Sequence, residues 1–185
     1  MKLSILILSI ESRADKLASL KARIEKLAPL NCEILVSLDN GEKTKGKKRN
    51  ELLQAAKGEY IAFIDDDDNI SDNYFTLIYR GISAGVDCCE LKGMYYENGT
   101  QKKPFVHSIR YKAYDENKDF YERYPNHLNC IKASIAKQFK FISEGPQANH
   151  GEDTDWATQI HKSGLLKTEY PIKEVIYHYY YNSNK

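Results

Sequence analysis

Four consecutive carboxylates follow a short apolar segment in the middle of the chain. The segment YIAFI (60–64) has the composition of a buried strand, and Asp65, Asp66, Asp67 and Asp68 come directly after it. Four like charges in a row repel one another, and they cost free energy beside a core unless a positive partner holds them. Clustered oxygen ligands at a strand end suit Mg²⁺ or Mn²⁺, which are usually shared with substrate phosphates. The run therefore favours a metal site, with a solvated acidic turn as the alternative.

A basic segment lies shortly before this strand. The sequence EKTKGKKRN (42–50) contains Lys43, Lys45, Lys47, Lys48 and Arg49. A lysine-rich run is by default a solvated loop. A nucleoside diphosphate, however, needs a metal that bridges its phosphates and basic side chains that neutralise the remaining charge. An acidic edge facing a basic loop therefore predicts a site for a nucleoside diphosphate.

The elements that would bring these segments together alternate along the first part of the chain. Strand-like segments at 2–9, 32–38 and 60–64 are separated by helical patterns at 15–27 and 49–58. Ser12 and Asp15 have the spacing of a capping box for the first helix, and Ser71 is placed to cap a third. This alternation predicts a parallel sheet with helices on its faces.

In such a sheet, ligands bind beyond the carboxyl ends of the strands. The segments that follow the three predicted strands are 9–13, 39–48 and 65–68. We therefore expect these segments to meet in one crevice.

The second half of the chain has a less regular pattern. Two strands are expected around an Asn98-Gly99 turn, helices at 133–139 and at 152–164, and a last strand at 173–181. No domain boundary is visible, so we expect a single domain, 1–185, with a nucleotide-binding half (1–85) and an acceptor-binding half (86–185).

The composition excludes few classes of protein. The 27 basic and 26 acidic residues give a formal net charge of +1, so there is no strong signal for nucleic-acid binding. No apolar run approaches the roughly 20 residues of a membrane helix. The four cysteines have no metal-binding spacing and are expected to be free thiols, which indicates a cytoplasmic protein. The 14 tyrosines suit sugar stacking and core packing equally well.

The segment GKKRNELLQAAKGEYIAFIDDDDNIS (46–71) resembles the nucleotide-binding half of GT-A glycosyltransferases, and of family 2 in particular. These enzymes carry a G-x-x-RN helix, a GEYI segment and a strand that ends in a D-x-D motif. Four further segments resemble the family in the same order: SIESR (9–13), LDNG (38–41), GEDTDWA (151–157) and YHYYYN (177–182). The resemblance implies an α/β fold of the GT-A (Rossmann-like) type, with a mostly parallel central sheet flanked by helices.

The resemblance also implies roles for individual residues. The metal would be held by Asp67 and by Asp65 or Asp66, with His178 as a third ligand, and Asp39 would contact the base. The residues expected to bind the nucleotide-sugar are Ser9, Glu11, Arg13, Asp39, Lys45, Lys48, Arg49, Asp65 and Asp66.

A second acidic group stands at the start of a predicted helix, where Glu152, Asp153 and Asp155 are close together. Acidic residues favour helix N-termini through the dipole alone. The resemblance makes Asp153 the catalytic base and Glu152 a neighbour that orients the acceptor. Trp156 is either a sugar platform or a helix-packing residue. His127 and His150 are expected to line the acceptor site.

These expectations describe a metal-dependent, inverting glycosyltransferase that uses Mn²⁺ or Mg²⁺. It would move a sugar from a nucleoside-diphosphate sugar, with UDP as the expected nucleotide, to an acceptor hydroxyl on a glycan. The short acceptor half would be minimal, or completed by an oligomer or a partner.

Three alternatives stay open. A nucleotidyltransferase usually has a Gly-rich loop after the first strand, and LSIESRADK (8–16) contains no glycine. A non-catalytic nucleotide- or sugar-binding module would not need Asp153. An acceptor hydroxyl on a modified DNA base is disfavoured by the balanced charge.

Overall fold

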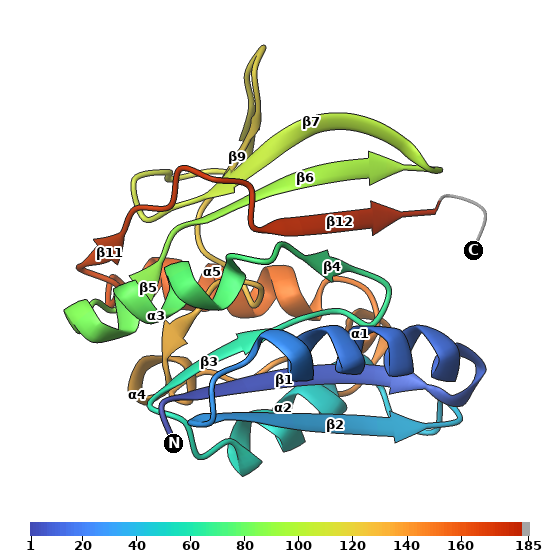
Figure 1. The fold of residues 1–185 in the computed structure, drawn as a ribbon. Coiled ribbons are helices and arrows are strands. Elements are labelled where there is room, and N and C mark those ends of the chain that lie inside the picture. The colour runs from blue at the N-terminus through green and yellow to red at the C-terminus, as the bar shows by residue number, and fades with distance from the viewer. Residues whose placement is uncertain (183–185) are drawn as a thin grey trace.

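The computed structural model describes residues 1–182, and within them the strands form two sheets of six strands each (Figure 1). The first sheet has the order β11-β5-β10-β3-β1-β2, and the second has the order β4-β12-β6-β7-β9-β8. The first sheet carries the predicted N-terminal strands. The second sheet lies on the side of helix α3 and is built from the second half of the chain, apart from its edge strand β4 (Figure 1).

The first sheet is mixed. Its strands are β1 (Leu3–Ile10), β2 (Cys32–Asp39), β3 (Tyr60–Phe63), β5 (Cys88–Cys89), β10 (Ile131–Lys132) and β11 (Glu169–Tyr170). Strand β1 pairs in parallel with β2 and β3, as the sequence predicted, whereas β10 is antiparallel to β3 and β5. The expectation of a mostly parallel sheet therefore needs correction at β10. The chain enters β10 from the second sheet, without the crossover helix that a parallel pairing requires.

Both faces of the first sheet are covered, which explains why β1 is apolar at nearly every position. Leu3, Ile5 and Ile7 face a core shared with α1 (Ala14–Leu27) and α3 (Tyr74–Ala84). Leu6 and Leu8 face a second core, which includes residues of α2 (Lys45–Ala55), α4 (Ala133–Ala136) and α5 (Glu152–Ser163). The sheet is thus the middle layer that holds the strand ends rigid.

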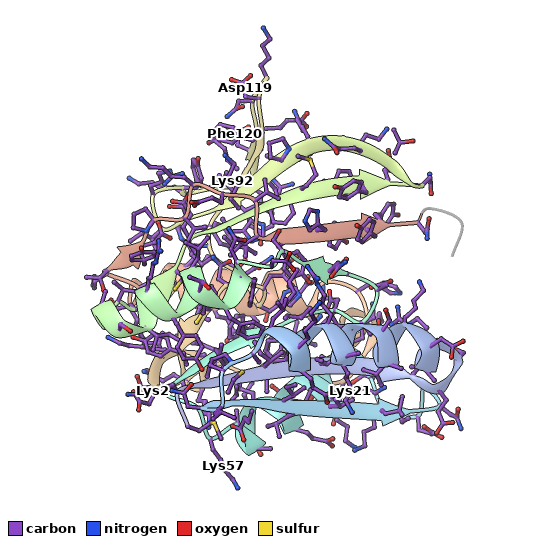
Figure 2. All side chains as sticks on the ribbon, viewed as in Figure 1. Lys2, Lys21, Lys57, Lys92, Asp119 and Phe120 are labelled. Carbon is purple, nitrogen blue, oxygen red and sulfur yellow. The ribbon has the colours of Figure 1, made fainter. Side chains whose placement is uncertain are left out.

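The second sheet contains β4 (Asn69–Ile70), β6 (Leu91–Glu97), β7 (Thr100–His107), β8 (Asp115–Glu116), β9 (Tyr121–Arg123) and β12 (Tyr177–Tyr181). Strands β6 and β7 form the predicted hairpin, and Asn98 and Gly99 at its turn have φ of 50° and 78°. Strand β12 is parallel to β6 over its whole length. The hairpin of β8 and β9 projects from the body, with Asp119 and Phe120 at its tip (Figure 2).

Two helix starts differ from the sequence expectation. Helix α1 follows a 3₁₀ turn, η1 (Glu11–Arg13), and Arg13 at its N-cap makes no side-chain cap bond, so the proposed Ser12 and Asp15 capping box is wrong. Ser71 does not cap α3 but donates from Oγ to the Val175 carbonyl over 2.9 Å. The tertiary partner of Ser71 lies more than 100 residues away, so no local pattern could reveal it.

Helix α2 begins at Lys45, where Thr44 accepts a cap bond from the Lys47 backbone N–H over 3.2 Å. The basic residues from Lys45 onward are therefore helical and do not form a loop. Helix α5 ends as predicted at Gly164, with φ of 63°. The second 3₁₀ turn, η2 (Pro146–Ala148), precedes α5.

The four cysteines are free thiols, which confirms the sequence expectation. In the part of the chain that the structure describes, no helix has both the length and the apolar character needed to cross a membrane.

Candidate active site

The carboxyl ends of β1, β2 and β3 meet at one edge of the first sheet, and contacts join the three segments that follow them. Ser9, at the end of β1, donates from Oγ to Asp66 Oδ2 over 2.5 Å. Lys48 donates from Nζ to the Ser9 carbonyl over 2.8 Å and forms an ion pair with Asp39 at the end of β2. The predicted crevice is therefore present.

Two arginines are the positive partners of the first three aspartates. Arg13 lies 3.1 Å from Asp66 Oδ1 and 3.1 Å from Asp67 Oδ2. Arg49 Nη2 lies 3.2 Å from Asp65 Oδ1, and its Nε lies 3.4 Å from Glu152 Oε1. These ion pairs explain how adjacent carboxylates are tolerated next to a buried strand.

The fourth aspartate is held by strand β12. Tyr177 donates from its hydroxyl to Asp68 Oδ2 over 2.7 Å, and the Tyr180 backbone N–H donates to Asp68 Oδ1 over 2.8 Å. Burial raises the pKa of Asp68 well above its ordinary value. Asp68 is therefore a structural link between the two sheets.

The environment separates the pKa values of neighbouring carboxyl groups. Burial alone would raise the pKa of Asp65, but the charge and hydrogen bond of Arg49, with the His127 imidazole close by, hold it well below its ordinary value. Burial raises the pKa of Asp66, although Ser9 and Arg13 oppose the shift. The pKa values of the adjacent Asp65 and Asp66 are thus shifted in opposite directions.

The exposure of the aspartates fits a D-x-D motif made of Asp65 and Asp67. Their side chains are 28% and 19% exposed, whereas that of Asp66 between them is 1% exposed. Within residues 1–182, no cluster of three or more His, Cys, Asp or Glu side chains is arranged to hold a metal ion. A pair of carboxylates suits Mg²⁺ or Mn²⁺, which takes its other ligands from water and substrate phosphates.

The expected third metal ligand, His178, is not part of this arrangement. Its Nε2 lies 3.2 Å from Ser71 Oγ, and its Nδ1 lies 3.3 Å from the Tyr96 hydroxyl. Alternation along β12 explains the difference, because His178 points to the opposite face of the strand from Tyr177, which contacts Asp68. The structure therefore corrects this assignment.

The basic residues expected to contact the diphosphate also need correction. Lys48 and Arg49 are 3% and 4% exposed, and each is paired with carboxylates of the protein. Lys45 is exposed on the first turn of α2, where its backbone N–H donates to Asn149 Oδ1 over 2.9 Å. Arg13, whose side chain is 28% exposed, is the more accessible of the two arginines at the D-x-D carboxylates.

Asp39 is fixed by its own loop. Its carboxylate accepts from the backbone N–H groups of Gly41 and Lys43 over 2.9 and 3.0 Å. Burial opposes ionisation, but Lys48 and these donors lower the pKa of Asp39. Glu11, in the 3₁₀ turn that follows β1, is exposed.

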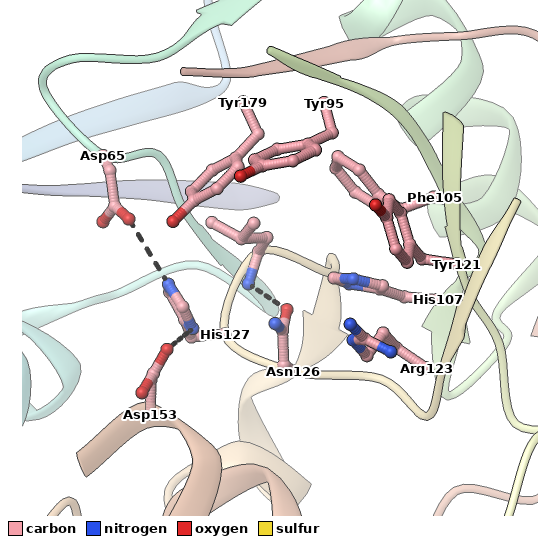
Figure 3. A pocket seen from close by; sticks show the side chains of 11 residues that line it. Asp65, Tyr95, Phe105, His107, Tyr121, Arg123, Asn126, His127, Asp153 and Tyr179 are labelled. Carbon is pink, nitrogen blue, oxygen red and sulfur yellow. Dashed lines mark hydrogen bonds and ion pairs between the residues drawn. The ribbon is translucent and has the colours of Figure 1, made fainter. Parts of the chain in front are cut away.

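A pocket of about 350 Å³ opens next to Asp65 and extends under the second sheet (Figure 3). His127 lies between two carboxylates of this pocket, with Nε2 3.7 Å from Asp65 Oδ2 and Nδ1 3.8 Å from Asp153 Oδ2. Both ring nitrogens are buried and have no hydrogen-bond partner among residues 1–182. His127 thus lines the pocket between Asp65 and the start of α5, and its part in acceptor binding stays a prediction.

The acidic residues at the start of α5 have different environments. The Asp153 side chain is 36% exposed and lines the pocket. Glu152 is buried against Arg49, so it is a structural partner and not a contact for the acceptor.

Trp156 is fully buried and stacks on Phe141 with ring centroids 4.7 Å apart, so it packs the core and forms no sugar platform. His150 is exposed outside the pocket.

Sequence reasoning missed the wall of the pocket that the second sheet provides. The lining residues from this sheet are Tyr95, Phe105, His107, Tyr121, Arg123 and Tyr179, and the segment after β9 adds Asn126 and Leu128. The high tyrosine content of the second half was a signal, but it did not show which tyrosines share a face. Pairing of β6 with β12 puts Tyr95 opposite Tyr179.

Comparisons with known proteins agree with this geometry. The profile of the family described as Glycosyl transferase family 2 matches residues 17–143, which is more than half of the chain. No curated protein sequence is similar enough to count as a match.

Among solved structures, the chain is similar to residues 1–349 of TarS from S. aureus in complex with UDP, with 15% identity and a TM-score of 0.70 over 98% of this chain and 61% of that one. It is also similar to the same part of TarS in complex with UDP-GlcNAc, with 15% identity and a TM-score of 0.67 over 100% and 60% of the two chains. The chain thus spans about 60% of the length of these structures. The likeness confirms the fold, and the profile match shows that the chain belongs to glycosyl transferase family 2.

Proposed function

We propose that this protein transfers a sugar from a UDP-sugar to an acceptor hydroxyl on a glycan, with the help of Mg²⁺ or Mn²⁺ and with inversion at the anomeric carbon. One observation carries the proposal: Asp65 of the D-x-D motif and Asp153 of the ED motif face one pocket, on either side of His127. Complexes of TarS with UDP and UDP-GlcNAc support a uridine nucleotide as donor.

The donor would bind at the edge formed by 1–85. Asp39 is available for the base, and Asp65 and Asp67 would hold the cation together with the donor phosphates. A bound divalent cation supplies Lewis-acid stabilisation of the leaving diphosphate. Arg13 contributes a guanidinium at the same edge, where its two nitrogens already bridge Asp66 and Asp67.

The acceptor would bind along the part of the pocket formed by 86–185. Asp153 would remove the proton from the acceptor hydroxyl as its oxygen attacks the anomeric carbon, while the bond from that carbon to the diphosphate breaks. Direct displacement by one attacking oxygen inverts the configuration. His127 lies between Asp65 and Asp153, within 4 Å of both carboxylates, and would orient Asp153 during the reaction.

The alternatives predict other products. A nucleotidyltransferase would release pyrophosphate from UTP and a sugar phosphate, and a binding module would bind UDP without turnover. If the acceptor is a modified DNA base, the protein would transfer the sugar to duplex DNA that carries this base.

The test is an assay for UDP release with purified protein, MnCl₂ and UDP-GlcNAc, UDP-glucose or UDP-galactose as donor. We expect UDP release that stops when EDTA removes the metal, and that falls in the Asp153→Asn variant although UDP still binds. If the protein binds UDP tightly but produces no UDP from any of the donors with a panel of glycan acceptors, the result would favour the binding module. Pyrophosphate release from UTP would favour the nucleotidyltransferase.

A further inference from the structure

The pocket has different charges at its two ends. Asp65 and Asp153 lie at one end, and Arg123 lies at the other, beside His107 (Figure 3). Arg123 is half-buried at the end of β9, and its Nη1 donates to the backbone carbonyls of Asp115 and Glu122 over 3.1 and 3.0 Å. Carbonyl groups carry no net charge, so these bonds orient the guanidinium without neutralising it.

Arg123 differs in this respect from the arginines at the acidic end. Arg13 and Arg49 each form ion pairs with carboxylates of the protein. For the residues that the structure describes, Arg123 forms no ion pair with any carboxylate. Its guanidinium instead lies over the rings of Tyr114 and Tyr121, 4.7 and 5.7 Å from their centroids. The protein has thus built a rigid, uncompensated cation into the pocket wall.

His107 does not share this charge. Burial lowers the pKa of His107 to about 3, so the imidazole is neutral at physiological pH. The Asn129 amide nitrogen donates to the Cys89 carbonyl over 3.0 Å, which leaves Asn129 Oδ1 to accept from His107 Nδ1 over 3.3 Å. The remaining nitrogen, Nε2, is therefore a hydrogen-bond acceptor suited to a hydroxyl group.

Three tyrosines contribute to the wall between the two ends. Tyr95 and Tyr179 are opposite each other in the register of β6 and β12, and their rings stack at 5.8 Å. Tyr121 meets Tyr95 edge to face at 5.9 Å. Tyrosine combines an apolar ring with a hydroxyl group, which suits the two kinds of surface of a sugar.

These features restrict the chemistry of the acceptor. The negative charge of the donor diphosphate belongs at the D-x-D end, so a second anion would be repelled there. An acceptor whose hydroxyl reaches Asp153 can extend along the tyrosines to Arg123. On the basis of the proposed function, we propose that the acceptor is an anionic saccharide whose sugar ring packs on Tyr95, Tyr121 and Tyr179 and whose carboxylate or phosphate group binds Arg123. A guanidinium matches either group with two parallel hydrogen bonds.

The proposal can be tested with matched methyl glycosides as acceptors. The methyl glycosides of glucose, galactose and mannose would each be used in three forms, with a hydroxyl, a carboxylate or a phosphate group at position 6. UDP-GlcNAc is the donor and Mn²⁺ the cation. The readouts are acceptor-dependent UDP release and the mass of the product. We expect an anionic glycoside to exceed its neutral partner by about 10-fold or more in kcat/KM. The two anionic arms distinguish a carboxylate from a phosphate.

Variants test whether Arg123 is the cause of this preference. Arg123→Gln should lose the preference mainly through a higher acceptor KM, and Arg123→Lys should keep part of it. Arg80→Gln is the matched control, because Arg80 is exposed on α3 and outside the pocket, and it should keep the full preference.

Calorimetry of UDP and Mn²⁺ binding distinguishes a failure of the anionic acceptor from a failure of the proposed function. Wild type and all three variants should bind UDP equally. Wild type could bind UDP and release it from the donor, yet use neutral glycosides as well as anionic ones, or use neither. In that case the anionic acceptor is wrong and the proposed function stands. If wild type does not bind UDP at all, both proposals are overturned.

Discussion

Arg49 Nη2 lies 3.2 Å from Asp65 Oδ1, so helix α2 is tied directly to the first carboxylate of the D-x-D motif. The same guanidinium lies 5.1 Å from the centre of the Phe63 ring and reaches Glu152 at the start of α5. One buried side chain therefore joins the strand end, the basic helix and the helix of the proposed base. Arg49 thereby fixes the position of the segment of Asp65 relative to the start of α5.

Replacing Arg49 should destabilise the protein. Arg49→Met removes the charge but keeps an apolar stem, and it leaves Asp65 and the buried Glu152 without their cation. Breaking a buried ion pair by removing one partner typically costs about 3–5 kcal/mol. Urea denaturation should show a loss of this size, whereas Arg80→Met on the exposed face of α3 should change the free energy of unfolding by less than about 0.5 kcal/mol. Equal unfolding midpoints for the two variants would mean that Arg49 is not structurally important.

The metal assignment predicts a specific defect in Asp67→Asn. The variant keeps the size of the side chain, but its amide is a weaker oxygen ligand than the carboxylate. The affinity for UDP in the presence of Mn²⁺ should therefore fall by about 10-fold or more relative to wild type. UDP affinity in EDTA should change much less. Calorimetric titration of UDP with and without the metal measures both quantities.

Asp72→Asn is the control for this experiment. Asp72 is 84% exposed and pairs with Arg23, close in sequence to the D-x-D motif but outside the pocket. It should bind UDP as wild type does under both conditions. If Asp67→Asn and Asp72→Asn behave alike, Asp67 is not a metal ligand.

The sequence was sufficient to predict the three parallel strands β1, β2 and β3 of the first sheet and the edge at which they end. Apolar alternation with helical segments indicated β1, β2 and β3, and parallel strands necessarily bring their carboxyl ends to the same edge. The resemblance to the family assigned roles to Asp65 and Asp153, and the structure places both in one pocket. These features depend on local patterns or on an ordered set of motifs.

The partners of the charged residues could not be predicted in this way. A lysine or arginine in the sequence shows its charge but not the carboxylate that it meets, so Lys48 and Arg49 were expected at the diphosphate although both are buried in ion pairs. Trp156 did carry a usable signal, because it lies four residues before Ile160 and thus on the same buried face of α5. The identity of the pocket tyrosines depends on the pairing of β6 with β12, two strands about 80 residues apart.

The buried His107 predicts a pH dependence of stability. Its pKa is about 3 in the folded state and 6.5 when unperturbed, so the unfolded chain binds a proton that the folded protein does not bind at pH 5. Stability should therefore be complete above pH 6.5 and fall as the pH decreases, with a loss of about 2 kcal/mol from this residue at pH 5.

His107→Gln should remove this contribution. The amide can still donate to Asn129 but does not titrate, so the free energy of unfolding of the variant should depend less steeply on pH between 7 and 5. Urea titrations at several pH values measure the slope. His150→Gln, at an exposed histidine, should retain the slope of wild type. An unchanged slope in His107→Gln would show that His107 is not held in the neutral form.

The assignment of Asp153 as the base predicts separate effects on binding and transfer. Asp153→Asn keeps the size of the side chain but cannot accept the acceptor proton, so transfer should fall by roughly 10²–10⁴ while UDP and Mn²⁺ bind normally. Asp155→Asn is the matched control: Asp155 lies in the same first turn of α5 but accepts from Gln159 Nε2 over 2.6 Å, and it should transfer at a near-normal rate. Glu152→Gln should lower the unfolding midpoint, because Glu152 is buried against Arg49. Steady-state kinetics, calorimetry and urea denaturation of the three variants give these quantities. If Asp153→Asn retains transfer and a folded Glu152→Gln variant has none, then Glu152 is the base and its contact with Arg49 must open during the reaction.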